Sequence, residues 1–247
     1  DLVLERAELP MPELLTEKNM RQIRAAEKLI RKKRRQYEIQ NRQFADMQPV
    51  PFLQEYLDRT TFRNKDGEVC EFTLLTKHDL NHVLQKRYAL LNWQQGSGKT
   101  AAVYHRAKYL LKFHKVRNAV ILAPAIATNM TWIPFLTINR EKFRIVRSNA
   151  DLETVPEDVF LILSTSMLSK LKRGLSQFVR RTSGKLCLVF DESDEITNPS
   201  SQRTRLVLSI FRRLKYKILD TGTTTRNTRI DKNFLYFKEH FLFILRD

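Results

Sequence analysis

The sequence predicts an α/β fold in which a mainly parallel sheet is flanked by helices. From about residue 75 onward, short apolar runs alternate with stretches of helical periodicity. Strands that are apolar along their whole length are typical of a parallel sheet covered on both faces. Several of the runs lead into acidic or glycine-bearing turns, and ligands of open α/β sheets bind at the carboxyl ends of the strands. The expected strands are residues 88–93, 119–123, 143–146, 159–163, 186–190 and 217–219.

Before this region, the chain begins with a basic segment that we expect to be helical over about residues 11–46. Met20, Ile23, Ala26 and Ile30 recur at helical spacing, and residues 21–35 hold eight basic side chains and one acid. We expect residues 1–50 to form an extension that contacts nucleic acid or a protein partner, or that lies as a solvated helix on the main domain. Residues 51–247 would then form the main lobe, which starts with a small hairpin around a turn at residues 64–67.

Composition narrows the function classes. The chain has 247 residues, enough for one large domain or for a domain with an appendage, and a net charge of +17. Such a charge attracts polyanions, of which nucleic acid is the commonest large one; an acidic protein or an anionic membrane surface is the alternative. The two cysteines are too few for a disulfide framework, and no run approaches about 18 apolar residues. We expect an intracellular protein, in the cytoplasm or in a nucleus or nucleoid, with no membrane partner.

The first chemical motif is a phosphate-binding loop between the strand at residues 88–93 and the helix expected at residues 101–113. Backbone N–H groups at a helix start carry partial positive charge, and glycines allow close approach to phosphate oxygens. Lys99 would reach the β- and γ-phosphates, and the Thr100 hydroxyl would bind Mg²⁺. The strict pattern has glycine where Trp93 stands, and a Gly/Ser turn before a helix is the alternative interpretation. The expected nucleotide-binding residues are Gln95, Gly96, Ser97, Gly98, Lys99 and Thr100.

Two further motifs follow later strands. Asp191 and Glu192 come directly after the run at residues 186–190, so one acid can hold Mg²⁺ and the other can orient the attacking water. An acidic cap of the strand is the alternative. The turn at residues 221–223 follows the last run, and its hydroxyls could sense the γ-phosphate; as a bare Thr/Gly turn it would carry no information.

In this order and spacing, the motifs resemble those of the first motor lobe of a superfamily 2 helicase-like ATPase, most closely of the Snf2-type branch. Residues 95–100 resemble motif I, residues 189–201 resemble motif II with a Snf2-like extension, and residues 221–227 resemble motif III. Pro124, with Asn129 and Trp132, is similar to motif Ia. The resemblance covers about residues 75–237.

This resemblance implies a RecA-like lobe that binds ATP and Mg²⁺ and couples hydrolysis to translocation on double-stranded DNA. The alternatives are a strand-separating helicase, the motor subunit of a restriction system, or a nucleotide-gated nucleic-acid-binding module with weakened catalysis. The implied catalytic residues are Lys99, Asp191 and Glu192, with Thr100 and Asp191 at the metal. The implied coupling residues are Asp194, Thr221, Gly222 and Thr223.

The sequence also departs from the family pattern. Asp194 stands in place of a usual His, and an ionised acid cannot donate a hydrogen bond. Asp79 lies nearest the position where the family has a Gln that reads adenine. Some viral members of the family have a His similar to His78 at this point, so a phage or viral origin, with a place in the virion, is one interpretation. The second lobe and its arginine fingers do not follow motif III in this sequence, so we expect poor hydrolysis by this chain alone.

Two more side-chain groups have alternative interpretations. Trp132 is expected to pack in the core rather than to stack on bases. The basic run at residues 203–217 could follow a phosphate backbone or form a solvated helix face.

Overall fold

The computed structural model describes residues 17, 20–21, 23–25, 27–28, 30–31, 35, 48–93, 96–182, 184–196 and 201–222. The chain divides into two units, Asp1–Gln48 and Pro49–Asp247. The described residues between 17 and 35 are helical. The other features predicted for the N-terminal extension lie outside the described residues, and its suggested contacts with nucleic acid or protein stay predictions.

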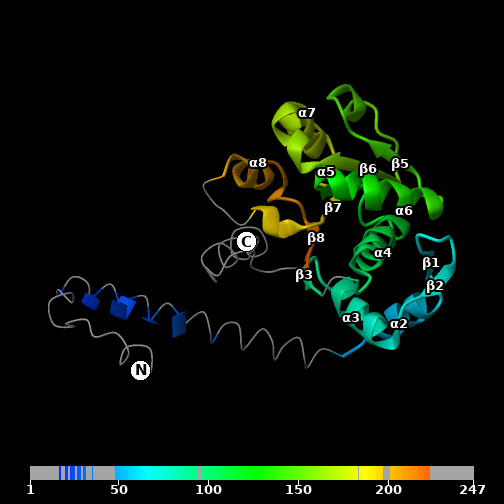
Figure 1. The fold of residues 1–247 in the computed structure, drawn as a ribbon, viewed down its shortest axis with the longest axis horizontal. Coiled ribbons are helices and arrows are strands. Elements are labelled where there is room, and N and C mark those ends of the chain that lie inside the picture. Colours follow the sequence, from blue (N-terminus) through cyan, green and yellow to red (C-terminus); the bar gives the residue numbers. More distant parts are fainter. Residues whose placement is uncertain are drawn as a thin grey trace. The chain divides into compact units, whose positions relative to one another are not determined.

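The centre of the second unit is a six-stranded sheet in which every neighbouring pair of strands is parallel. The strand order is β3-β8-β7-β4-β6-β5, and Figure 1 labels all of these strands except β4. This confirms the predicted α/β class, with each expected run found as a strand within two residues of its predicted ends. The strands are β3 (Tyr88–Asn92), β4 (Asn118–Ala123), β5 (Phe143–Ile145), β6 (Val159–Ser164), β7 (Leu186–Phe190) and β8 (Tyr216–Thr221).

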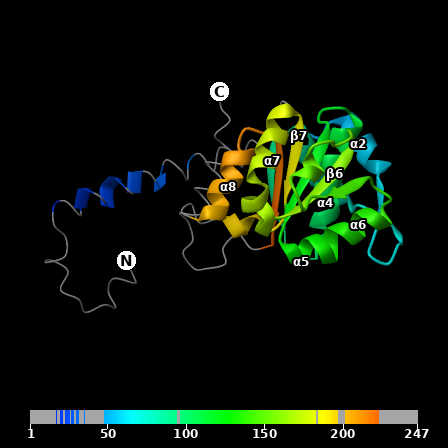
Figure 2. The same cartoon turned by 90° about the horizontal axis from the view of Figure 1, so that it is seen from above.

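Helices cover both faces of this sheet. The longer helices are α2 (Pro51–Asp58), α3 (Leu74–Gln85), α4 (Lys99–Lys112), α6 (Ile133–Ile138), α7 (Leu168–Arg181) and α8 (Gln202–Phe211). The shorter turns are α5 (Ala125–Ala127), η2 (Thr128–Trp132), η3 (Ala150–Leu152), η4 (Thr165–Met167) and η5 (Ser193–Ile196). Figure 2 shows α7 and α8 to one side and α2, α4 and α6 to the other. Among the described residues, none of these helices combines the length and apolar character needed to cross a bilayer.

The two faces form separate hydrophobic cores, because successive side chains of a strand point to opposite sides. In β4, Ile121 packs with residues of α2, α3 and α4, whereas Val120 and Leu122 pack with residues of α7 and α8. The strands β4 and β7 are buried at every position. The middle strands are therefore fixed by packing on both faces, and the loops at the ends of the strands are the parts available for a functional site.

The lobe begins with α2 and the predicted hairpin. Strands β1 (Thr61–Arg63) and β2 (Val69–Glu71) pair antiparallel, as expected. The helix α2 begins at Pro51. Proline suits the first turn of a helix, where its missing N–H group needs no partner, and Leu53 and Leu57 then bury one face of α2.

One basic residue of the run at residues 203–217 lies in the interior. Lys217 belongs to β8, is fully buried, and its ammonium group lies 5.6 Å from the centre of the Tyr88 ring. Burial lowers the pKa of Lys217 to about 8. Neither a phosphate contact nor a solvated helix face describes this residue, whereas Arg212, Arg213 and Lys215 are exposed.

Candidate nucleotide site

The described part of the loop between β3 and α4 holds two glycines with left-handed backbone. Gly96 and Gly98 have φ values of +79° and +81°, in the left-handed region that other residues enter at a cost. Gly98 is the N-cap of α4, and its carbonyl accepts the first helical bond from Ala102 N at 3.1 Å. Apart from the chain neighbours of each glycine, no described residue places an atom within 4 Å of a Cβ built on Gly96 or Gly98, so backbone conformation favours glycine at both positions. Gln95 lies outside the described residues.

Lys99 and Thr100 form the first turn of α4. The Lys99 ammonium group donates a hydrogen bond of 3.0 Å to the carbonyl oxygen of Trp93. This contact uses the main chain of Trp93, whose side chain packs against the core, so tryptophan at the position of the usual first glycine does not prevent it. Thr100 is half-buried at the second position of the helix, and Ser97 is exposed in the loop.

Strand order brings the three predicted motifs to one edge of the sheet. Strand β8 lies between β3, which enters the phosphate loop, and β7, which ends before Asp191. In register, Leu91 of β3 is opposite Asp220 of β8, and Leu219 of β8 is opposite Phe190 of β7. All three strands are parallel, so their carboxyl ends meet at the same edge.

Asp191 is largely buried at this edge. Its Oδ2 accepts a hydrogen bond of 2.7 Å from the indole Nε1 of Trp132, while its own backbone N–H donates to Leu122 O at 2.9 Å. Burial raises the pKa of Asp191; the hydrogen bond from Trp132 and the positive charge of Lys99 act in the opposite direction. The side chain is therefore held firmly, in a place where a nearby cation favours its ionised form.

Asp220 is a site residue that the sequence motifs did not single out. It ends the apolar part of β8, is only 1% exposed, and faces the carboxyl group of Asp191. Burial raises the pKa of Asp220 well above its ordinary value, and the charge of Asp191 raises it further. Burial and the negative charge of Asp191 therefore both favour the neutral form of Asp220. The only sequence signal is an acid directly after the apolar residues Ile218 and Leu219.

Glu192 follows Asp191 with a strained backbone. Its φ value is +52°, which for a residue with a side chain costs on the order of 1–2 kcal/mol. Its carbonyl oxygen accepts from Glu195 N at 3.1 Å, which starts the tight turn η5. Strain of this kind persists only where the surroundings enforce it, and it is concentrated at functional sites.

The coupling residues connect η5 to β8. The Thr221 hydroxyl donates to Asp194 Oδ1 at 3.2 Å, and the Ser193 hydroxyl donates to Asp220 O at 3.0 Å. Asp194 thus accepts a bond from the neighbouring motif and needs no proton to donate. Gly222 is the last described residue of this segment, and Thr223 lies outside the described residues.

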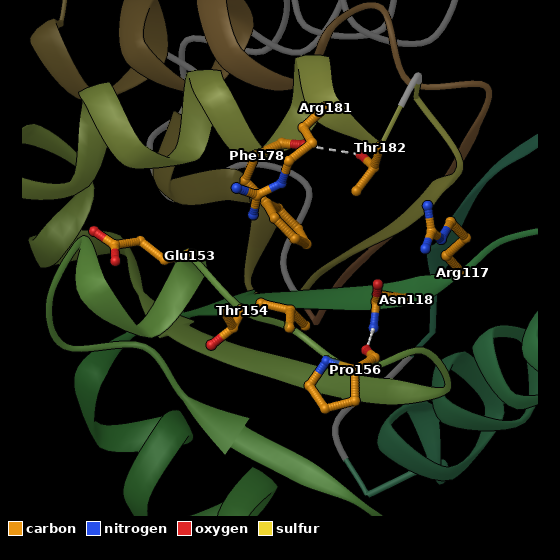
Figure 3. Close-up of a pocket in the computed structure, with 9 residues that line it drawn as sticks. Arg117, Asn118, Glu153, Thr154, Pro156, Phe178, Arg181 and Thr182 are labelled. Carbon is orange, nitrogen blue, oxygen red and sulfur yellow. Dashed lines mark hydrogen bonds between the residues drawn. The ribbon is translucent and has the colours of Figure 1, made fainter.

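A cavity of about 340 Å³ lies at the opposite edge of the sheet (Figure 3). It is bordered by Asn118 at the start of β4 and by Thr182 at the end of α7. The Asn118 amide donates to Pro156 O at 2.7 Å, and the Thr182 hydroxyl donates to Phe178 O at 2.9 Å. This cavity holds none of the predicted site residues, and these polar groups are already satisfied within the protein.

Comparison with known proteins supports the fold. No protein-family model and no curated protein matches the sequence. Among solved structures, the chain is similar to the Sulfolobus solfataricus SWI2/SNF2 ATPase core in complex with dsDNA, with a TM-score of 0.52 and 16% identity over 69% of this chain and 38% of that one. It is also similar to the UvsW helicase from bacteriophage T4, with a TM-score of 0.55 and 15% identity over 76% of this chain and 64% of that one. The lobe therefore has the RecA-like fold of helicase and Snf2 ATPase cores, and it spans less than two thirds of either neighbour.

Proposed function

We propose that this chain is the ATP-binding lobe of a Snf2-like, nucleic-acid-dependent ATPase that couples hydrolysis to translocation on double-stranded DNA. The observation that carries the proposal is the meeting of the Gly96–Gly98 loop with Asp191 at one edge of a parallel sheet. Lys99 leaves this loop, and its charge acts on both Asp191 and Asp220. A cation, a helix start and a pair of acids at one edge suit a nucleotide phosphate with a bound metal.

Each residue has a role in this proposal. The backbone of residues 95–98 and the Lys99 ammonium group bind the β- and γ-phosphates. Thr100 and Asp191 hold Mg²⁺, and Glu192 orients the attacking water. When bound, Mg²⁺ neutralises charge on the transferred phosphate.

The acids present at the site fit a divalent cation. Asp191 and Asp220 bring two carboxyl groups to this edge of the sheet, and Thr100 lies in the first turn of α4, which starts at the same edge. Oxygen ligands of this kind are those that Mg²⁺ prefers.

The bonds from β8 to η5 supply a path for coupling. Thr221 binds Asp194, and Ser193 binds the backbone of Asp220, so a shift of the acids on loss of the γ-phosphate would move the end of β8. Gly222 and Thr223 continue from that end. In this proposal they transmit the change toward the nucleic acid.

Double-stranded DNA is the proposed partner because the net charge is +17 and the Sulfolobus neighbour is bound to dsDNA. The exposed residues Arg212, Arg213 and Lys215 are candidates for contacts with phosphates, which would make binding salt-dependent and largely independent of sequence. Strand separation is the second candidate activity, because the other neighbour is a helicase. Triplex displacement without strand displacement would favour duplex translocation, and the converse would favour unwinding.

The first experiment measures binding of a fluorescent ATP analogue to the full chain. Lys99→Ala should weaken binding at least tenfold, because it removes the cation at the phosphates. Lys112→Ala is the matched control, since Lys112 ends the same helix and its exposed ammonium group lies over the Tyr56 ring. Equal affinities of the Lys99→Ala variant and the wild type would contradict the proposal.

A second experiment tests hydrolysis with and without duplex DNA. Glu192→Gln should keep nucleotide binding and lose about 10²–10⁴-fold in turnover, because the amide cannot accept a proton from water. Turnover that is unchanged in this variant would remove Glu192 from the mechanism. Binding without any turnover in the wild type, with or without DNA, would instead favour a nucleotide-gated binding module.

A further inference from the structure

We propose that Trp132 is a positioning residue that fixes the carboxylate of Asp191 for binding Mg²⁺. This inference rests on the proposed function of the site. It assigns a role to a residue 59 positions earlier in the chain, in a helical turn after β4.

The first support is the contact itself. The Trp132 indole N–H donates to Asp191 Oδ2 at 2.7 Å, a short bond to a charged acceptor. The indole is fully buried, in the same core as Ile121 and Val189 and with its ring centre 6.4 Å from that of Phe135. A buried indole N–H needs an acceptor, and the packing around the ring prevents it from turning to another.

The second support is the local backbone, which forms a π-helical turn over Thr128–Trp132. The Ile133 N–H donates to Thr128 O, five residues back, instead of to the usual position four residues back. The next residue is Pro134, which has no N–H group to donate to Met130 O. Such turns rotate the following side chains relative to a regular helix and recur at functional sites.

The turn separates inward and outward side chains sharply. Trp132 is 0% exposed, whereas Met130, two residues earlier in the same turn, is 75% exposed. Met130 therefore offers a control position that shares the unusual backbone but does not reach the acid.

The bond from Trp132 occupies Oδ2 of Asp191 and so determines which oxygen of this carboxylate faces the metal. With Oδ2 bound to Trp132 and the Asp220 carboxyl group alongside, the carboxylate of Asp191 is held in one orientation. Loss of a hydrogen bond that orients a metal-binding side chain typically weakens metal affinity 10–100-fold. We therefore expect the bond from Trp132 to affect Mg²⁺ affinity more than nucleotide affinity.

The test measures binding of a fluorescent ADP analogue to the full chain over a series of Mg²⁺ concentrations. Trp132→Phe keeps an aromatic ring but removes the donor, so it should raise the Mg²⁺ concentration at half-maximal binding about tenfold. Its affinity for the nucleotide in EDTA should equal that of the wild type. Met130→Ala should match the wild type in both measurements.

An isosteric replacement separates the hydrogen bond from packing. Benzothienylalanine at position 132 keeps the two fused rings and replaces the N–H group by sulfur, so it should reproduce the shift in Mg²⁺ dependence. If Trp132→Phe does not fold, the benzothienylalanine variant alone tests whether the hydrogen bond sets the Mg²⁺ dependence. In the Trp93→Phe background, Trp132 is the only indole of the chain, and its emission should change when Mg²⁺ is added to the nucleotide complex but not when nucleotide is added in EDTA.

The possible outcomes distinguish the two proposals. An unchanged Mg²⁺ dependence in the isosteric variant would overturn the role of Trp132, as would equal losses with and without Mg²⁺, which indicate packing alone. If the wild type binds no nucleotide under any condition, the proposed function of the site fails, and the positioning role fails with it.

Discussion

His105 should make the stability of the lobe depend on pH below neutrality. It lies in α4, the helix that starts at the phosphate loop, and is only 2% exposed. Its ring centre lies 5.0 Å from that of Phe72 and 4.6 Å from that of Tyr104. Within the part of the chain that the structure describes, neither ring nitrogen has a hydrogen-bond partner. Burial, with a smaller contribution from the charge of Lys108, lowers the pKa of His105 from 6.5 to about 3.

The sign and size of the effect follow from this lowered pKa. Above pH 6.5 the imidazole is neutral in both the folded and the unfolded chain, so it contributes its full stability. As pH falls, the unfolded chain binds a proton that the folded chain refuses, and stability is lost until the pH passes the folded value. Between pH 7 and pH 5 the loss is about 2 kcal/mol, and it depends almost only on the ordinary pKa because the folded value lies far below pH 5.

Urea unfolding at pH 7, 6 and 5 measures this loss. His105→Phe keeps an aromatic side chain beside Phe72 but cannot titrate, so its free energy of unfolding should fall about 2 kcal/mol less than that of the wild type over this range. Val103→Ala, a buried substitution in the same helix, should lower stability by the same amount at every pH. Parallel pH curves for wild type and His105→Phe would show that the folded protein can charge this histidine, and the reasoning from burial would be wrong.

Three further changes test the site. Gly98→Ala should cost about 1 kcal/mol in unfolding free energy because alanine must adopt φ near +81°, and it should weaken nucleotide binding; unchanged stability would mean that the loop relaxes. In metal-free buffer, Asp220→Asn should become more stable relative to the wild type as pH rises above 4, because the unfolded wild-type chain loses a proton that the folded chain keeps. The difference in unfolding free energy should grow by about 1.4 kcal/mol per pH unit up to the pKa of Asp220 in the folded chain. A difference between variant and wild type that does not change with pH would contradict this expectation. Thr221→Val removes the hydroxyl that donates to Asp194, so we expect a loss of about 1 kcal/mol in the free energy of unfolding. We also expect a smaller ratio of DNA-stimulated to basal ATPase activity. A ratio equal to that of the wild type would exclude coupling through this bond.

Local patterns in the sequence determined much of this lobe. Apolar runs set the six strands, because a strand buried on both faces must be apolar throughout. The turn at Gly67 set the hairpin, and the glycines before Lys99 set a loop that needs left-handed backbone. These features depend on residues that are close in the chain, where steric limits and side-chain spacing act directly.

The tertiary structure alone decided which of these elements meet. Nothing local in β8 indicates that it lies between β3 and β7, yet this order places Asp220 against Asp191 and Thr221 beside Asp194. The bond from Trp132 to Asp191 likewise depends on a π-helical turn and on the packing of a distant strand. Strand pairing and core packing join residues far apart in the chain, and the free energy that selects them belongs to the whole fold rather than to any one segment. The sequence by itself therefore determined the strands, the hairpin and the candidate site residues of the motifs, and only the tertiary structure decided which partners hold those residues in place.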